Sequence, residues 1–150
     1  MTHDEEKLAD LLTELYLLGQ DINDADKPLI HARIAGELQS GQWALVTARN
    51  GEDEGALWGW ISWYRVNDEV FEILKAEEQD SLVIAGEVVD IRGGDNLWLA
   101  TAIVAPWAPS STYRNLSALA KEANADCKRV GATLVKRDGS AKTYVRGLSA

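Results

Sequence analysis

The hydrophobic residues of this 150-residue chain change their spacing near Gln42, and this change restricts the possible folds more than any other feature. Before Gln42, leucines and isoleucines recur every three or four residues, which is typical of amphipathic helices. Thr2 and Glu5 have the spacing of a capping box, while Pro28 and Gly41 fit the first turn and the end of a second helix. After Gln42, apolar runs of strand length follow. The sequence therefore predicts two helices and then a region that is largely β-structure.

Six strands and two more helices are expected after the change of period. The expected strands cover residues 42–48, 56–66, 82–91, 97–104, 132–137 and 140–146. A short helix follows Asn67, which can cap it, and the longest helix covers residues 112–129 and is closed by Gly131. Asp138-Gly139 lies between two alternating runs, which is a strong hairpin signal. This order predicts a single α+β domain over residues 1–150, with a mostly antiparallel twisted sheet of about six strands.

Charge is distributed unevenly along the chain, whose formal net charge is −9. Residues 1–110 carry 7 basic and 21 acidic side chains, whereas residues 111–150 carry 8 basic and 3 acidic ones. An acidic protein is a poor general ligand for nucleic acid, because that binding depends on neutralising phosphates. The basic last quarter could hold a small anionic ligand or one acidic partner. The alternative is a basic helix and hairpin that are simply solvated.

The cellular compartment is expected to be the cytoplasm. Cys127 is the single cysteine, so no internal disulfide can form, and a reducing compartment is indicated. Residues 1–6 lack the basic head and apolar stretch of a signal peptide. The longest apolar runs, such as residues 97–104, fall well short of the roughly 20 residues that a membrane-spanning helix needs.

Three stretches resemble the RTX toxin-activating lysine acyltransferases, a family with the GNAT fold. Residues 42–47 (QWALVT) are similar to the first strand of that family, and residues 60–63 (WISW) with 67–70 (NDEV) are similar to its next strand and short acidic helix. Residues 94–98 (GDNLW), followed by 103–107 (IVAPW), resemble its Gly-Asp-x-x-Trp and Ile-Ala-Pro-Phe motifs. The likeness covers about residues 27–147 and implies a GNAT-like fold.

The resemblance also implies an activity. Those enzymes move a fatty acyl group from acyl carrier protein to a lysine of a protoxin, using a histidine helped by an aspartate. The aspartate position falls on Thr101 or Ala102, and an ungapped alignment puts the histidine position on Ile22, so neither catalytic residue is matched. His31 follows Pro28-Leu29-Ile30, which is loosely similar to the family's Pro-Leu-His, and it is the only histidine in an expected element.

His31 is therefore the candidate catalytic residue. An imidazole with a pKa near 6.5 can take the proton of an attacking lysine amine when a carboxylate orients it. The alternative is a surface or half-buried helical residue, and the failed family spacing predicts that His31 lies away from the donor loop. No metal site is expected, because the two histidines and the cysteine are far apart in the sequence.

The start of the expected helix at residue 112 is the candidate donor site. The residues there are Trp107, Ser110, Ser111, Thr112 and Arg114. Unpaired N–H groups and the positive end of a helix dipole attract phosphate, such as that of phosphopantetheine. The glycine motif of acetyl-CoA binders is missing, which favours acyl carrier protein over an ordinary acetyl-CoA donor. The alternative is a serine-capped helix without a ligand.

Two main functions are compatible with this sequence, and a structural or assembly component is a third, weaker alternative. The first is acyl transfer from acyl-acyl carrier protein, or from acyl-CoA, to a lysine of an acceptor protein, with Lys121, Lys128 and Arg129 extending a basic strip from the donor site. The second is a catalytically silent module of the same fold that binds or inhibits a partner protein. The missing carboxylate favours the second function, and the donor-side sequence favours the first.

Overall fold

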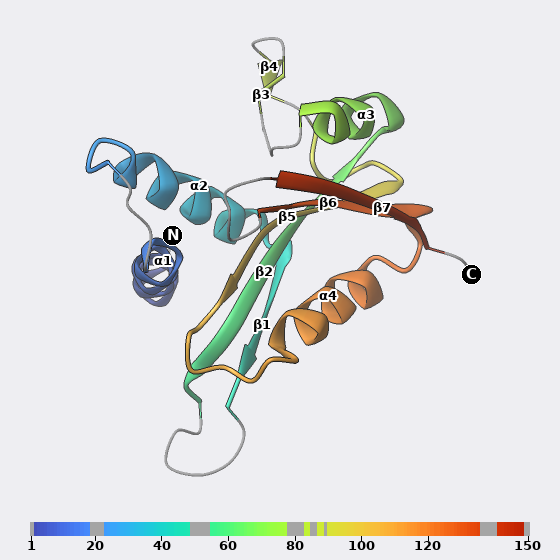
Figure 1. Cartoon of the computed structure of the whole chain (residues 1–150). Helices are drawn as coiled ribbons and strands as arrows, with labels where there is room; N and C mark the ends of the chain where they lie inside the picture. The colour runs from blue at the N-terminus through green and yellow to red at the C-terminus, as the bar shows by residue number, and fades with distance from the viewer. Residues whose placement is uncertain are drawn as a thin grey trace. The chain divides into compact units, whose positions relative to one another are not determined.

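The computed structural model describes residues 2–18, 23–48, 55–77, 83–84, 87–88, 90–135 and 141–148. Helices and strands occur almost in the expected order (Figure 1). The elements are α1 (His3–Leu17), α2 (Lys27–Ser40), β1 (Trp43–Thr47), β2 (Leu57–Val66), α3 (Asp68–Glu77), β3 (Val83–Ile84), β4 (Glu87–Val88), β5 (Asn96–Val104), α4 (Thr112–Ala123), β6 (Arg129–Val135) and β7 (Ala141–Gly147). The α+β class is confirmed.

The main sheet has five strands, in the order β1-β2-β5-β6-β7, and it is mixed. The expectation of about six strands is wrong, whereas the antiparallel pairs β1-β2 and β6-β7 agree with the expected mostly antiparallel sheet. The segment expected to form the third strand instead contains β3 and β4, which pair with each other in a separate two-stranded sheet. Strand β6 runs parallel to β5, and the connection through α4 is long enough for the crossover that a parallel pair requires.

The chain divides into two compact units. The first unit comprises residues 1–62 and 101–116, and the second comprises residues 63–100 and 117–150. Strands β2 and β5 and helix α4 each contribute residues to both units. The single domain expected from the length of the chain stays a prediction.

In the first unit, α1 and α2 lie side by side (Figure 1). The predicted capping box forms, since the Glu5 N–H donates to Thr2 Oγ1 at 3.2 Å. Pro28 stands in the first turn of α2, and Gly41 ends that helix with a φ of 75°. The core of this unit joins both helices to β2 and β5 through buried apolar side chains: Ala9, Leu12, Leu15, Ile34, Leu38, Trp60, Ile103 and Ala105.

Replacing Gly36 by alanine is expected to stabilise the protein. Gly36 is an exposed residue inside α2, and an added Cβ would have no atom within 4 Å. Alanine restricts the unfolded chain without strain in the helix, so the free energy of unfolding should rise by about 0.5–1 kcal/mol. Urea denaturation of the two proteins measures the difference. A loss of stability would contradict this prediction.

In the second unit, Trp98 and Phe71 pack edge to face with ring centroids 5.6 Å apart. Both rings are fully buried, and a Cβ on Gly131 would lie 2.7 Å from Trp98 and 2.8 Å from Phe71. Gly131 is thus required inside β6 by this close contact. The expectation that it closes a helix is wrong.

The helix expected over residues 112–129 ends at Ala123. The Asn124 amide donates to the Ala120 carbonyl at 2.8 Å, and the Cys127 N–H donates to the Asn124 carbonyl at 3.0 Å, so a turn replaces the last helical residues. The Lys128 N–H then donates to the Asp95 carbonyl at 2.8 Å, which draws the chain to β5 and starts β6. The hydrogen bond to Asp95 therefore ends the helix earlier than the spacing of its apolar residues predicts.

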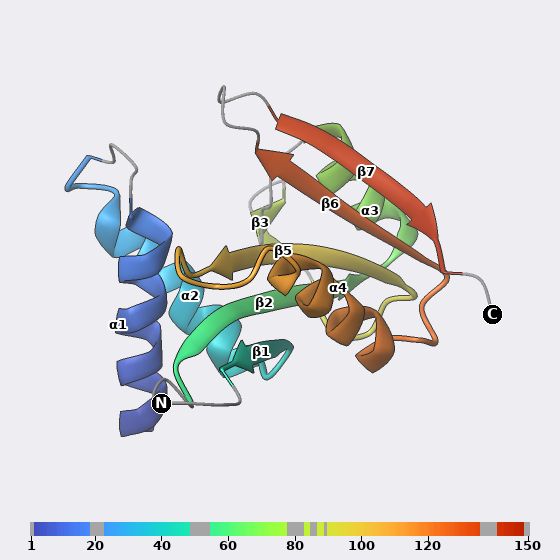
Figure 2. The same ribbon diagram turned by 60° about the horizontal axis from the view of Figure 1, so that its bottom comes forward.

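Strands β6 and β7 pair antiparallel over seven residue pairs, from Arg129 with Gly147 to Val135 with Ala141 (Figure 2). This pairing agrees with the predicted hairpin. Asp138-Gly139 itself lies outside the described residues.

Candidate functional site

His31 lies on α2, and its Nε2 is 2.9 Å from Oδ1 of Asp10 on α1. The His31 side chain is 40% exposed and that of Asp10 is 72% exposed. A carboxylate that contacts one imidazole nitrogen fixes the orientation of the ring and leaves the other nitrogen for a second partner. Ile22, the other candidate for the histidine position, lies outside the described residues.

Helix α2 and the first turn of α4 pack against opposite faces of β2. Trp60 belongs to the core formed with Leu12 of α1 and Ile34 of α2. On the neighbouring residue, Gly59, a Cβ would lie 2.8 Å from Leu116 and 2.9 Å from Thr112. Successive residues of a strand point to opposite faces. The structure therefore does not bring His31 to the start of α4, which agrees with the prediction drawn from the failed family spacing.

Thr101 is one of the two residues at the expected aspartate position, and its hydroxyl contacts a carboxylate from another element. Thr101 Oγ1 donates to Glu37 Oε1 at 2.9 Å, and Arg33 Nε donates to the same oxygen at 3.3 Å. The Glu37 side chain is 1% exposed and that of Arg33 is 38% exposed. A buried charge requires such partners.

Sequence reasoning missed Glu37. The available signal was its position three residues after Ile34 and seven after Ile30, on the face that the helical period assigns to the core. A carboxylate on that face indicates a buried polar contact. The sequence does not identify the partner, because Thr101 is 64 residues away.

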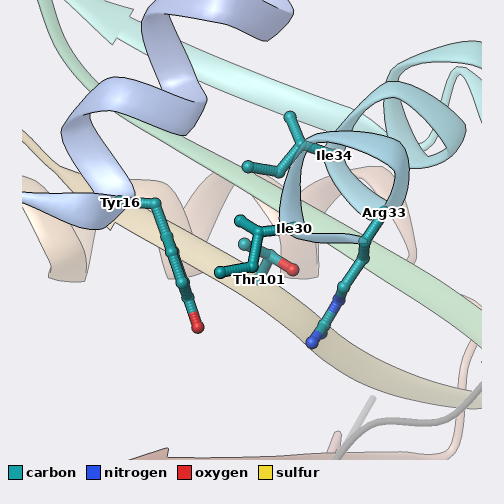
Figure 3. Close-up of a pocket in the computed structure, with 5 residues that line it drawn as sticks. All are labelled: Tyr16, Ile30, Arg33, Ile34 and Thr101. Carbon is teal, nitrogen blue, oxygen red and sulfur yellow. The ribbon is translucent and has the colours of Figure 1, made fainter. Parts of the chain in front are cut away.

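A small pocket adjoins this cluster and is lined by Tyr16, Ile30, Arg33, Ile34 and Thr101. The Tyr16 and Arg33 side chains extend along two sides, and Ile30 and Thr101 lie between them (Figure 3). Its cavity volume of about 30 Å³ has room for a water molecule. It is much smaller than the pockets that enclose small-molecule ligands, so it cannot hold a fatty acyl chain in this conformation.

The residues predicted for the donor site gather at the start of α4. Trp107 is 58% exposed, and its indole Nε1 donates to the Leu57 carbonyl at 3.1 Å, which fixes the ring. Ser110 and Ser111 are exposed, and the Ser111 carbonyl accepts the Asn115 N–H at 3.0 Å, so Ser111 is the residue before the helix.

Arg114 and Thr112 point to different environments. Arg114 is exposed and has no hydrogen-bond or ion-pair partner in the described part of the chain. Thr112 is 1% exposed against Gly59, and its N–H donates to the Pro109 carbonyl. Its Oγ1 is buried and finds no hydrogen-bond partner among the residues that the structure describes. Thr112 therefore anchors the helix and does not face solvent. Burial raises the pKa of the neighbouring Tyr113, so its phenol stays protonated.

The expected basic strip is interrupted. In the second unit, Lys128 Nζ lies 2.6 Å from Asp68 Oδ1, and Arg129 Nη1 lies 3.1 Å from Glu72 Oε1. The hydrogen bond from Lys128 lowers the pKa of Asp68. The pKa of Glu72 is lowered by the hydrogen bond from Lys75 and, to a smaller extent, by the hydrogen bond from Arg129. These ion pairs with α3 neutralise two of the three cations that were expected to extend the donor site.

The Gly-Asp-x-x-Trp motif, which contributes to the family resemblance, has a structural role here. A Cβ on Gly94 would lie 1.9 Å from the carbonyl carbon of Val66, so only glycine fits. The Asn96 amide donates to the Val66 carbonyl at 2.9 Å and to Asp68 at 3.0 Å. Trp98 is fully buried. The motif joins the end of β2 to the start of β5.

Comparison of the sequence with protein-family models gave no match, and a search among curated proteins also gave none. The resemblance to the toxin-activating acyltransferases therefore stays a prediction. In the described residues, no helix is both long and apolar enough to cross a membrane. The same part of the chain contains no group of three or more histidine, cysteine, aspartate or glutamate residues that could hold a metal ion.

Proposed function

We propose that this chain is an acyltransferase-like protein of the cytoplasm that binds the phosphopantetheine arm of acyl carrier protein, or an acyl-CoA, at the start of α4. The observation that supports the proposal is the guanidinium of Arg114 in the first turn of a helix, which is exposed and has no partner among the described residues. The first N–H groups of a helix have no partner within it and attract phosphate. Trp107, fixed by its hydrogen bond to Leu57, offers an apolar surface in the same loop.

In the proposed reaction a lysine amine of an acceptor protein attacks the thioester carbonyl of the donor. An amide bond forms, the carbon–sulfur bond breaks, and the sulfur leaves as a thiol after taking up a proton. The attacking amine must lose a proton, and His31, oriented by Asp10, is the candidate base, although it does not lie at the start of α4. It would accept the proton at the ring nitrogen that does not contact Asp10.

A second function, a catalytically silent module that binds a partner protein, has support from different observations. The first turn of α4 and the helix that carries His31 lie on opposite faces of β2. Neither Thr101 nor Ala102, the two residues at the expected aspartate position, is a carboxylate, and the pocket beside Thr101 is the size of a water molecule. Such a module would bind acyl-acyl carrier protein and leave the thioester intact.

Replacing Arg114 by alanine is expected to weaken the binding of acyl carrier protein by roughly 10- to 100-fold. A charge-assisted contact to phosphate contributes about 1.5–3 kcal/mol, and about 1.4 kcal/mol is a factor of ten in affinity. The measurement is a titration of labelled acyl carrier protein, with its phosphopantetheine arm, at low and moderate salt. Binding should fall as salt rises, because exposed charges are screened.

Arg92→Ala is the matched control for this titration. Arg92 is exposed, and its side chain also has no partner in the described residues, so the substitution removes the same charge from a residue that is not part of α4. It should leave the affinity almost unchanged. Equal weakening by both substitutions, or no binding by the wild-type protein, would refute the donor site.

Incubation of the protein with octanoyl-acyl carrier protein and a lysine peptide separates the two functions. If the wild-type protein releases free thiol and the His31→Ala variant does not, acyl transfer is supported. Binding without thiol release would support the silent module.

A further inference from the structure

Strand β7 forms one edge of the five-stranded sheet, and in the described residues it pairs with β6 alone. Its pairing is continuous from residue 141 to residue 147 without a bulge. The opposite edge strand, β1, has five residues and an irregular register between Val46 and Thr47. Bulges and short strands protect an edge from pairing with another chain. Strand β7 has neither protection.

The outer side of β7 presents backbone hydrogen-bonding groups. The Leu148 N–H donates to the Lys128 carbonyl at 3.0 Å, so residue 148 points toward β6. Along a strand, the N–H and C=O groups of successive residues point to alternate sides. The groups of Ala141, Thr143, Val145 and Gly147 therefore point away from β6, toward the edge at which the described residues supply no further strand. A second strand can pair with them.

The side chains of β7 give this edge a charge pattern. Lys142, Tyr144 and Arg146 alternate along the strand and so share one face of the sheet. All three are exposed, and Lys142 Nζ lies 5.2 Å from the centre of the Tyr144 ring. Val145, on the other face, is 41% exposed. The edge thus carries an aromatic ring between two cations.

This charge pattern disfavours a second copy of the same strand. Antiparallel pairing of two β7 strands centred on Tyr144 puts Lys142 opposite Arg146 of the other copy, twice. Like charges directly opposite each other destabilise a strand pair, whereas opposite charges stabilise it. Two carboxylates four residues apart on an extended segment would meet both cations, and an apolar residue midway between them would meet Tyr144.

We propose that β7 is a docking edge for an extended acidic segment of a partner protein with the pattern acidic-x-apolar-x-acidic. The partner segment adds a sixth strand to the sheet, with main-chain hydrogen bonds to the outward groups of residues 141, 143, 145 and 147. The two carboxylates and the apolar residue give the specificity. This surface belongs to the second unit and does not depend on the donor site at the start of α4.

The test uses the whole protein and a fluorescein-labelled peptide, Ser-Glu-Thr-Val-Thr-Glu-Ser, in an anisotropy titration. The Val145→Pro variant removes an N–H that points away from β6, and a proline is tolerated at such an edge position. It should bind the peptide at least tenfold more weakly than the wild-type protein. The Val145→Thr variant keeps the N–H and should bind normally. Urea denaturation and circular dichroism check that both variants are folded.

A charge swap supplies an independent test. The double variant Lys142→Glu with Arg146→Glu should lose at least tenfold in affinity for the glutamate peptide and gain affinity for the same peptide with lysine at both positions. If Val145→Pro does not fold, the wild-type protein is titrated with a glutamate peptide that carries N-methyl groups on alternate amides. This peptide should bind at least tenfold more weakly than the unmodified glutamate peptide.

Two results would overturn the proposal. The first is no binding of the glutamate peptide by the wild-type protein, or binding by Val145→Pro and by the charge-swapped variant that is as tight as binding by the wild-type protein. The second is a concentration-dependent dimer in analytical ultracentrifugation that Val145→Pro abolishes, because this would make a second copy the occupant of the edge.

Discussion

Replacing Gly94 by alanine is expected to lower the free energy of unfolding by about 3 kcal/mol or more. The added methyl group would lie 1.9 Å from the carbonyl carbon and 2.0 Å from the carbonyl oxygen of Val66. Backbone atoms cannot move aside as a side chain can, so the connection between β2 and β5 would have to shift. That shift would also strain the hydrogen bonds from Asn96 to Val66 and Asp68.

The neighbouring Gly93 provides a control for this change. A Cβ on Gly93 would lie 2.8 Å from Oδ2 of Asp90, which is the end of a side chain that can rotate away. Gly93→Ala should therefore change the stability by less than about 1 kcal/mol. Urea denaturation of the wild-type protein and both variants gives the comparison. Similar free energies of unfolding for the two variants would contradict the close packing at Gly94.

Replacing Thr101 by valine should lower the free energy of unfolding by about 2 kcal/mol. The substitution keeps the shape of the side chain but removes the hydroxyl that donates to Glu37 at 2.9 Å. Hydrogen bonds to charged groups contribute about 1.5–3 kcal/mol, and a buried carboxylate that loses a donor also keeps its cost of desolvation. Urea denaturation at neutral pH measures the change.

Thr133→Val is the matched control, because the Thr133 hydroxyl lies 3.1 Å from the uncharged hydroxyl of Thr143 and forms no hydrogen bond with a charged group in the described part of the chain. It should cost less than about 1 kcal/mol. A second check combines Thr101→Val with Glu37→Gln. The cost of removing the Thr101 hydroxyl should be smaller without the charge, and the difference gives the coupling energy of the pair. An unchanged cost in the Glu37→Gln background would mean that Thr101 does not stabilise the carboxylate.

Part of the candidate site could be predicted from the sequence. Trp107, Ser110, Ser111 and Arg114 gather at the start of α4 because they are close in the sequence and the helix begins where its signals predict. The buried side chain of Thr112 could not be predicted. Its position depends on Gly59 of β2, which has no side chain and so lets the helix come close.

Contacts between distant segments decided the rest of the site. Glu37 and Thr101 meet because α2 packs on β5, and Lys128 and Arg129 meet the carboxylates of α3. No local pattern specifies such partners. The same holds for His31, which is a plausible base in the sequence but lies on the helix that covers the other face of β2.

The sequence by itself determined the ends of several helices of this protein. The capping box at Thr2, the proline and glycine that bound α2, and the asparagine cap of α3 all act within a few residues, through hydrogen bonds and backbone preferences. The tertiary structure alone decided the parallel pairing of β5 with β6, the early end of α4 and the place of Gly131. These features depend on hydrogen bonds and ring packing between segments about thirty residues apart, such as Asp95 with Lys128 and Trp98 with Gly131, and such contacts exist only after the chain has folded.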